Sequence, residues 1–185
     1  MLRDPSAVQI TRIHITGGPG AGKTRLARRL ARARSLPLHD LDGLLLAAEN
    51  RVDRLEANGT ASGLANSPRW VSDGVYFAWA QPFLDRAHIV LWLDVPWRVA
   101  SYRMIARHVR LELNRQNRFP GWRRFHSFWR WAARYYANGN EPTLDRFGVP
   151  NTRSTVIGEL MPYQDKLIVC RTNNEVNDVF TRLTT

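Results

Sequence analysis

Eight consecutive residues near the start of the chain match the phosphate-binding pattern Gly-x-x-x-x-Gly-Lys-Thr (the P-loop) at every position. They are Gly17, Gly18, Pro19, Gly20, Ala21, Gly22, Lys23 and Thr24. Glycines allow a tight turn whose backbone N–H groups point at phosphate oxygens, and a following helix adds the positive end of its dipole. In this pattern Lys23 places its charge against the β- and γ-phosphates, and the Thr24 hydroxyl is suited to Mg²⁺. The stretch therefore predicts a site for ATP and Mg²⁺.

The flanking residues predict the elements that must position this loop. Val8 to Thr16 alternates branched apolar residues with polar ones, which is typical of a strand. Leu26, Leu30 and their alanine neighbours then repeat at helical spacing, with arginines on the other faces. Strand, glycine loop and helix is the setting that the pattern requires; the alternative is a glycine-rich turn that binds nothing.

Two aspartates follow the second predicted strand. Leu36 to Gly43 indicates a short strand that ends in Asp40 and Asp42. Residues just past the carboxyl ends of strands line the ligand crevice of an α/β sheet. These carboxylates could therefore bind Mg²⁺, take a proton or bind a substrate hydroxyl, whereas the alternative is a solvated turn in which an aspartate caps a helix.

Two further aspartates end the next two predicted strands. Asp73 closes Trp70 to Gly74, and Asp94 lies near the end of the apolar run His88 to Pro96. Each is a candidate for the acid that orients Mg²⁺, and each could instead be a structural acid paired with a backbone N–H. The sequence leaves this choice open, and we also consider Asp73 a candidate for the acceptor side of the site.

Composition limits the kind of protein and its partners. A chain of 185 residues predicts a single domain over residues 1–185. A net charge of +11 favours anionic partners such as nucleotides, phosphorylated metabolites or nucleic acid. Arginine supplies most of this charge, since Lys23 and Lys166 are the only lysines. The single cysteine, Cys170, excludes an internal disulfide, and without a signal peptide or a long apolar segment we expect a cytoplasmic protein and no membrane contact.

The remaining patterns predict a fold of alternating strands and helices. We expect helices over 44–57, 97–116, 122–136 and 175–183, a polar loop or flap over 58–68, an irregular stretch over 138–162 and a last strand over 165–170. The last helix should be entered through a cap at Asn173 or Asn174. Aromatic residues repeat at helical spacing over 122–136, which favours a packing face over a base-stacking surface. The fold class is α/β, with a five-stranded parallel sheet covered by helices on both faces.

The motifs resemble those of adenylate-kinase-type P-loop proteins. The glycine loop is similar to theirs, and in Leu93-Asp94-Val95-Pro96 the proline is followed by Arg103 and Arg107 at the spacing found where those kinases enter their lid. The resemblance implies a P-loop NTPase fold with a helical lid inserted at about residues 108–140. It also implies that Arg103 and Arg107 meet the transferring phosphoryl group, and that Arg171 and Asn173, after the last strand, contact the adenine.

A closer resemblance is to small bacterial P-loop kinases called DNA topology modulation proteins. The similar features are Leu41-Asp42, a Trp-x-x-Asp-Gly-x-Tyr segment from Trp70 to Tyr76, and the aromatic, arginine-rich stretch from Trp122 to Tyr136. Asp40-Leu41-Asp42 also resembles the Asp-x-Asp of shikimate-kinase-type enzymes, in which one acid serves Mg²⁺ or proton removal and the other holds the substrate hydroxyl. Trp97 departs from the pattern, because many relatives have arginine after the proline.

These features predict a small-molecule kinase that moves the γ-phosphoryl group of ATP to a hydroxyl or phosphate acceptor. Lys23, Asp40, Arg103 and Arg107 are the expected catalytic residues, Thr24 and Asp40 the Mg²⁺ ligands, and Asp42 and Asp73 the acceptor contacts. The expected partners are a nucleoside triphosphate and a small acceptor, and the protein could be a monomer or a homodimer. The alternative is a nucleic-acid-binding P-loop protein or a polynucleotide kinase, supported by the +11 charge and the arginine-rich lid.

Overall fold

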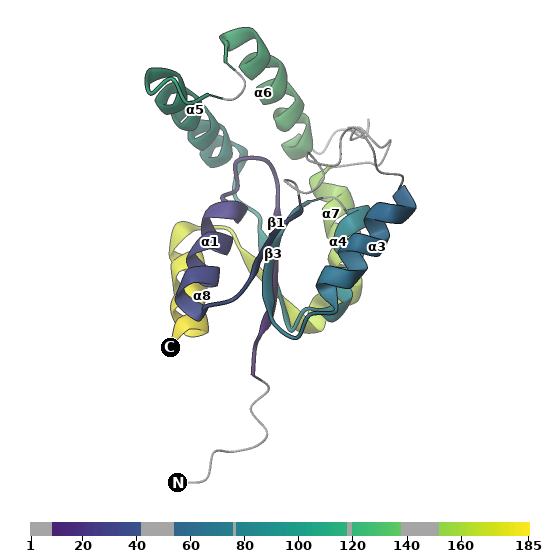
Figure 1. Cartoon of the computed structure of the whole chain (residues 1–185). Coiled ribbons are helices and arrows are strands. Elements are labelled where there is room, and N and C mark those ends of the chain that lie inside the picture. Colours follow the sequence, from purple (N-terminus) through teal and green to yellow (C-terminus); the bar gives the residue numbers. More distant parts are fainter. Residues whose placement is uncertain (1–8, 42–53, 76, 118–119, 138–151) are drawn as a thin grey trace.

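Five parallel strands form one twisted sheet at the centre of the protein (Figure 1). The computed structural model describes residues 9–41, 54–75, 77–117, 120–137 and 152–185. The strands are β1 (Arg12–Gly17), β2 (Leu38–Asp40), β3 (Trp70–Asp73), β4 (Ile89–Leu93) and β5 (Leu167–Cys170), in the order β2-β3-β1-β4-β5. All four pairings are parallel, so the carboxyl ends of the strands meet at one edge. The predicted five-stranded parallel sheet is confirmed.

Helices cover both faces of the sheet and a two-helix hairpin projects beyond its carboxyl edge (Figure 1). On one face lie α1 (Lys23–Arg34) and α8 (Asn173–Thr184), and on the other lie α3 (Arg54–Ala65), α4 (Phe77–Arg86) and α7 (Arg153–Leu160). The hairpin consists of α5 (Trp97–Leu113) and α6 (Trp122–Tyr136), and a short 3-10 helix, η1 (Met161–Lys166), precedes β5. The helix predicted over 122–136 is confirmed at both ends.

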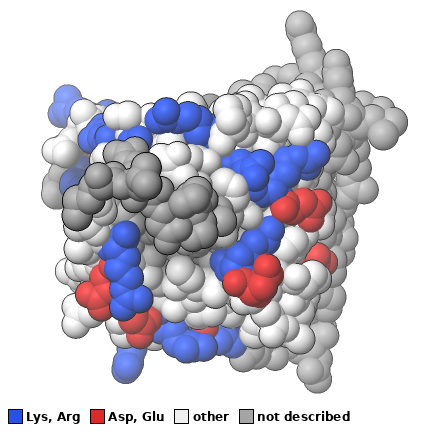
Figure 2. All heavy atoms as spheres, turned by 90° about the horizontal axis from the view of Figure 1, so that it is seen from below, with Lys and Arg blue, Asp and Glu red and all other residues white. Residues whose placement is uncertain are grey.

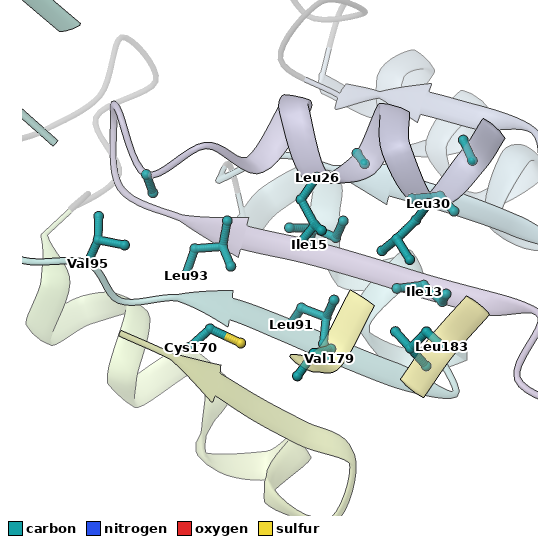
Figure 3. Packing of buried hydrophobic residues seen from close by; sticks show 14 of the residues in the cluster. Ile13, Ile15, Leu26, Leu30, Leu91, Leu93, Val95, Cys170, Val179 and Leu183 are labelled. Atoms are coloured by element: carbon teal, nitrogen blue, oxygen red, sulfur yellow. The ribbon is translucent and has the colours of Figure 1, made fainter. Parts of the chain in front are cut away.

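The alternation of residues along the strands divides the core into two layers. Ile13, Ile15 and Leu91 face α1 and α8, where they pack against Leu30 and Val179 (Figure 3). Successive strand residues point to opposite faces, so the intervening residues face α3, α4 and α7. There a second layer is built from aromatic and aliphatic side chains, including Trp70, Phe83, Trp92, Val156 and Leu160.

Two of the sequence predictions of irregular structure were wrong. Asn58 to Ala65 belongs to α3 rather than to a polar loop. Of the helix predicted over 44–57, residues 44–53 lie outside the described residues. Ala61 and Ala65 are buried, so packing outweighs the low helix propensity of Gly59 and Gly63. Within the stretch predicted as irregular, 153–160 forms α7, since the Thr152 side chain caps it by accepting from the Thr155 N–H.

Two further predictions needed correction near the end of the chain. The cap of α8 is Thr172 rather than Asn173 or Asn174, because Thr172 and Glu175 form a reciprocal capping box. The last strand begins at Leu167, since Asp165 and Lys166 belong to η1. Helix α4 was not predicted; it contains Pro82 and packs on the sheet through Phe83 and Leu84.

A buried histidine on β1 makes stability depend on pH. The pKa of His14 falls to about 3, first because burial desolvates the imidazole and second because Lys23 is nearby. Only the unfolded chain then protonates this group between pH 6.5 and about 3, so its contribution to stability is complete above pH 6.5 and is lost as the pH falls through this window. We expect His14→Gln to flatten that loss by up to about 1.4 kcal/mol per pH unit in urea unfolding. Parallel pH profiles for the two proteins would contradict this.

Candidate functional site

The glycine loop has the backbone shape that phosphate binding requires. Gly17, Gly20 and Gly22 have positive φ values of 148°, 77° and 102°, a region that side chains disfavour. Gly22 is also the N-cap of α1, and no side chain caps this end. The first N–H groups of the 12-residue helix α1 thus point at the loop without a side-chain acceptor, which is the arrangement that suits a phosphate anion.

The loop is closely packed on its outer side. A Cβ atom added to Gly20 would lie 2.6 Å from the carbonyl oxygen of Ala100 on α5. A Cβ atom added to Gly18 would lie 2.4 Å from the Tyr135 ring and 2.6 Å from the Tyr136 hydroxyl, both on α6. These glycines are therefore required by the approach of the hairpin as well as by the turn.

Lys23 lies inside the loop and is nearly buried. Its Nζ donates to the carbonyl oxygens of Gly17 at 2.9 Å and of Gly18 at 3.4 Å, and the residue is 8% exposed. The ammonium group is thus held at the centre of the glycine turn, where a bound phosphate would meet it.

The next residue connects the loop to the neighbouring strand. The Thr24 hydroxyl donates to Oδ2 of Asp73 at 2.6 Å, and Asp73 is fully buried at the end of β3. Asp40 ends β2 directly opposite Asp73 in the strand register, so two acids lie side by side at this edge. Asp42, the predicted acceptor contact, lies outside the described residues.

Asp94 has a different environment, which separates the two candidates that the sequence left open. Arg153 donates to both its carboxylate oxygens, from Nε at 2.6 Å and from Nη2 at 2.7 Å, and Nε of Arg171 lies 3.5 Å away. An arginine that donates two hydrogen bonds to one carboxylate forms a strong pair. The hydrogen bonds to Asp94 raise the pKa of Arg153. Asp94 is therefore engaged by arginines, whereas Asp73 contacts Thr24.

The Asp94 pair is expected to contribute to stability. Arg153→Ala leaves a carboxylate that is only 5% exposed with the more distant Arg171, and we expect a loss of about 2 kcal/mol in the free energy of unfolding. Arg171→Ala, which removes a guanidinium that is 64% exposed, should cost less than about 1 kcal/mol. Urea unfolding of the two variants measures the difference, and equal losses would contradict this ranking.

Arg103 joins three parts of the site. From α5, its Nη1 donates to the Ala21 carbonyl of the loop at 2.7 Å, and its Nη2 donates to Oδ1 of Asn173 at 2.6 Å. Partial burial lowers its pKa, and Arg25 nearby lowers it further. Asn173 and the glycine loop are thereby held together, as expected if both contact one nucleotide. Arg107 lies one turn further along α5 and is exposed.

The hairpin touches the loop through the end of α6. The Tyr136 hydroxyl donates to the Pro19 carbonyl at 2.8 Å, and the Tyr136 ring packs against Trp97, with 5.3 Å between ring centroids. Trp97 also packs on Trp129, whose indole donates to Ser101 at 2.8 Å. Much of the aromatic stripe on α6 is thus a packing face, as the sequence indicated.

Sequence reasoning missed three residues of this region: Tyr135, Tyr136 and Arg153. The tyrosines were assigned only to a packing stripe, and Arg153 lay in a stretch without periodicity. The hydrogen-bond partner of Tyr136 is Pro19, 117 residues away in the chain, and that of Arg153 is Asp94, 59 residues away. No local pattern could therefore have found these contacts.

Solved structures share this fold. A shikimate kinase from Acinetobacter baumannii in complex with shikimate gives a TM-score of 0.51 at 16% identity, over 94% of this chain and 90% of that chain. An uncharacterized protein from Eubacterium ventriosum gives 0.51 at 14% identity, over 95% and 99%. At such identities the similarity establishes the fold alone, which this chain shares with both structures. No family model and no curated protein matches the sequence.

Two observations concern metals and membranes. Across the described ranges, no three histidine, cysteine, aspartate or glutamate side chains converge as a metal cage. Mg²⁺ does not need one, since it is commonly bound by one or two carboxylates together with substrate phosphates. In the same ranges, every helix is too short or too polar to cross a bilayer.

Proposed function

We propose that this protein is an ATP-dependent kinase that transfers the γ-phosphoryl group to a hydroxyl or phosphate group of a small molecule. The observation that carries the proposal is the hydrogen bond from Thr24 to Asp73 beside Lys23, in an intact glycine loop at the carboxyl edge of the sheet. This arrangement unites a phosphate cradle, a cation and a metal-side acid. The fold shared with a shikimate kinase supports the same class of reaction.

The loop would hold the phosphates in place for transfer. Its N–H groups and the N-terminus of α1 bind phosphate oxygens, and Lys23 exchanges its contacts with Gly17 and Gly18 for the β- and γ-phosphates. Phosphoryl transfer asks mainly for alignment and charge stabilisation, and these groups supply both.

The residues present fit Mg²⁺. Thr24 and Asp40 would hold it, and Asp73 would orient the Thr24 hydroxyl, on the metal side of the site rather than on the acceptor side. When bound, the ion neutralises charge on the phosphates. Asp40 would also take the proton of the acceptor hydroxyl, and Asp42 would orient that hydroxyl.

The arginines of α5 would act from the hairpin side. Arg103 connects the loop to Asn173. Asn173 and Arg171 would contact the adenine, as the resemblance implies. Arg107 would reach the transferring phosphoryl group when residues at about 108–140 act as a lid on the single domain. The proposal also includes a relationship to DNA topology modulation proteins, a cytoplasmic location and a monomeric or homodimeric state.

Acceptor-dependent release of ADP from Mg-ATP tests the proposal. The panel contains sugars, hydroxy acids, nucleosides, nucleoside monophosphates, aminoglycosides and short 5′-hydroxyl oligonucleotides, with Lys23→Ala as the blank. Stimulation by one small class is the expected result. ATP binding without stimulation by any acceptor in the panel would count against a small-molecule kinase.

A second candidate, nucleic-acid binding, is favoured by the charge of the hairpin. The described parts of 97–137 contain nine arginines and one acidic residue, Glu112. Arg123, Arg130 and Arg134 recur along one side of α6, and the Trp122 side chain is 59% exposed. The opposite face of the protein also carries basic groups, but there they are scattered and have acidic neighbours (Figure 2). Arginines and exposed aromatic rings on one element are typical of single-strand binding.

Salt dependence distinguishes this candidate. Binding to a short single strand should weaken with salt by a slope of about −0.7 per phosphate contact. Replacing Arg123, Arg130 and Arg134 together by glutamine should reduce that slope by about 2, whereas Arg28, Arg32 and Arg182, exposed on α1 and α8, are the matched control. Equal effects of the two triple variants would leave only a nonspecific charge effect.

A further inference from the structure

The central strand has one polar face. Ile13 and Ile15 belong to the apolar layer under α1 and α8, so the alternation turns Arg12, His14 and Thr16 toward α3, α4 and α7. A strand in the middle of a parallel sheet covered on both faces is normally apolar throughout. Polar residues along this face of β1 therefore require an explanation.

The strand register identifies their neighbours. Ser72 on β3 lies opposite His14, and its hydroxyl is 2.9 Å from His14 Nδ1. One step toward the carboxyl edge, Thr16 lies opposite Trp92 on β4. Tyr135 of α6 belongs to the same buried layer as Trp92, and its ring lies against Gly18 of the glycine loop. We call His14, Thr16, Trp92 and Tyr135 the polar cluster.

Each member of the polar cluster is deeply buried and has an unused polar atom. The residues are 0%, 1%, 5% and 3% exposed in that order. Four of their atoms have no hydrogen-bond partner in the described part of the chain: His14 Nε2, Thr16 Oγ1, Trp92 Nε1 and the Tyr135 hydroxyl. Burial raises the pKa of Tyr135, and the nearby Trp92 side chain offsets part of that rise. The Trp92 Nε1 and the Tyr135 hydroxyl nevertheless do not have the geometry of a hydrogen bond. An unpaired buried polar group costs about 1–3 kcal/mol, so a ligand that supplies partners recovers that cost.

The chemistry of the polar cluster selects the ligand. Hydroxyl groups donate and accept, an indole N–H donates, and a neutral imidazole nitrogen does one or the other, so an alcohol can pair with all of them. The polar cluster contains no cation to offset a buried carboxylate or phosphate. The guanidinium of Arg153 lies 5.6 Å from the Trp92 ring centre, and its charge is already paired with Asp94, to which its Nε and Nη2 donate.

We propose that the polar cluster forms the inner wall of the acceptor site and that the acceptor is an uncharged polyhydroxyl compound, such as a sugar, a cyclitol or a nucleoside. This inference rests on the proposed kinase function. An acceptor hydroxyl oxygen bonds to the γ-phosphorus while the bond from that phosphorus to the bridging oxygen of ADP breaks, and the hydroxyl proton passes to Asp40. The remaining hydroxyls pair with the polar cluster.

Matched acceptors that differ by one charged group test the ligand class. Glucose is compared with gluconate and glucose 6-phosphate, and uridine with uridine monophosphate, by acceptor-dependent ADP release. We expect the uncharged member of a pair to have at least a tenfold higher kcat/KM. Use of only the charged members would overturn the inference and leave the kinase function standing. Stimulation by no acceptor above the Lys23→Ala blank would overturn both.

Two conservative variants test the residues. Thr16→Val and Tyr135→Phe each remove one hydroxyl, so the KM for the acceptor should rise about tenfold while the KM for ATP stays constant. Because the hydroxyls are unpaired without ligand, both variants should keep or raise the thermal midpoint. Tyr163→Phe is the matched control, since the Tyr163 hydroxyl already has a partner: it donates to Asp85 at 2.5 Å. A lower midpoint with an unchanged acceptor KM would overturn the assignment.

Discussion

Lys23→Ala should lower the turnover of acceptor-dependent ADP formation on the order of a thousandfold. The ammonium group is held inside the glycine turn, at 2.9 Å from the Gly17 carbonyl. Removing a preorganised charge that stabilises a transferring phosphoryl group costs a factor of about 10³ or more in well-studied cases. Steady-state ADP release at saturating ATP measures the effect.

The chain offers a matched control for this variant. Lys166, the only other lysine, donates to the Asp85 carbonyl at 3.0 Å, just before β5 begins. Lys166→Ala makes the same change of side chain and net charge outside the site, so its turnover should stay within about twofold of the unmodified protein, as is usual for such surface changes. Similar losses in both variants would exclude a specific role for Lys23.

Asp73→Asn should lower turnover by about 10- to 100-fold and raise the Mg²⁺ concentration needed for half-maximal rate. Groups that orient a metal ligand have effects of this size, and Asp73 accepts from Thr24 at 2.6 Å. The asparagine keeps the shape of the side chain but removes its charge. A Mg²⁺ titration of the rate separates this effect from a loss of folded protein.

Asp94→Asn is the contrasting variant. Its carboxylate is engaged by Arg153 and Arg171, so we expect lower thermal stability and an unchanged Mg²⁺ requirement. The reverse pattern in the two variants would assign the metal to Asp94. A rise in the acceptor KM of Asp73→Asn without a change in Mg²⁺ dependence would instead support an acceptor contact for Asp73.

Local patterns were enough to predict the sheet and the glycine loop. The P-loop is continuous in sequence, and each strand has a period or an apolar run of its own, so neither depends on distant residues. Helix α7 was missed because its stability depends on burying Val156 and Leu160 in a layer built by other elements. The capping box of Thr172 and Glu175 was a local signal that was present in the sequence and overlooked.

The contacts between distant residues could not be predicted in the same way. The choice between Asp73 and Asp94 depends on Thr24 and Arg153, which lie 49 and 59 residues from those acids. The polar cluster depends on strand register, because only the pairing of β1 with β4 places Thr16 opposite Trp92. The sequence contains the residues of such groups, but it does not show that they lie close together in the fold.

Because the C-terminal end of α6 contacts the glycine loop, a small rotation there produces a larger movement at the other end of the helix. The helix meets Pro19 and Gly18 through Tyr136 and Tyr135 at its C-terminal end, while its other end projects away from the sheet (Figure 1). A helix of 15 residues is about 22 Å long, so a rotation of about 10° at the loop moves the far end by about 4 Å. A small rotation at the phosphate loop would thus be amplified at Trp122, and a fluorophore placed there would report it.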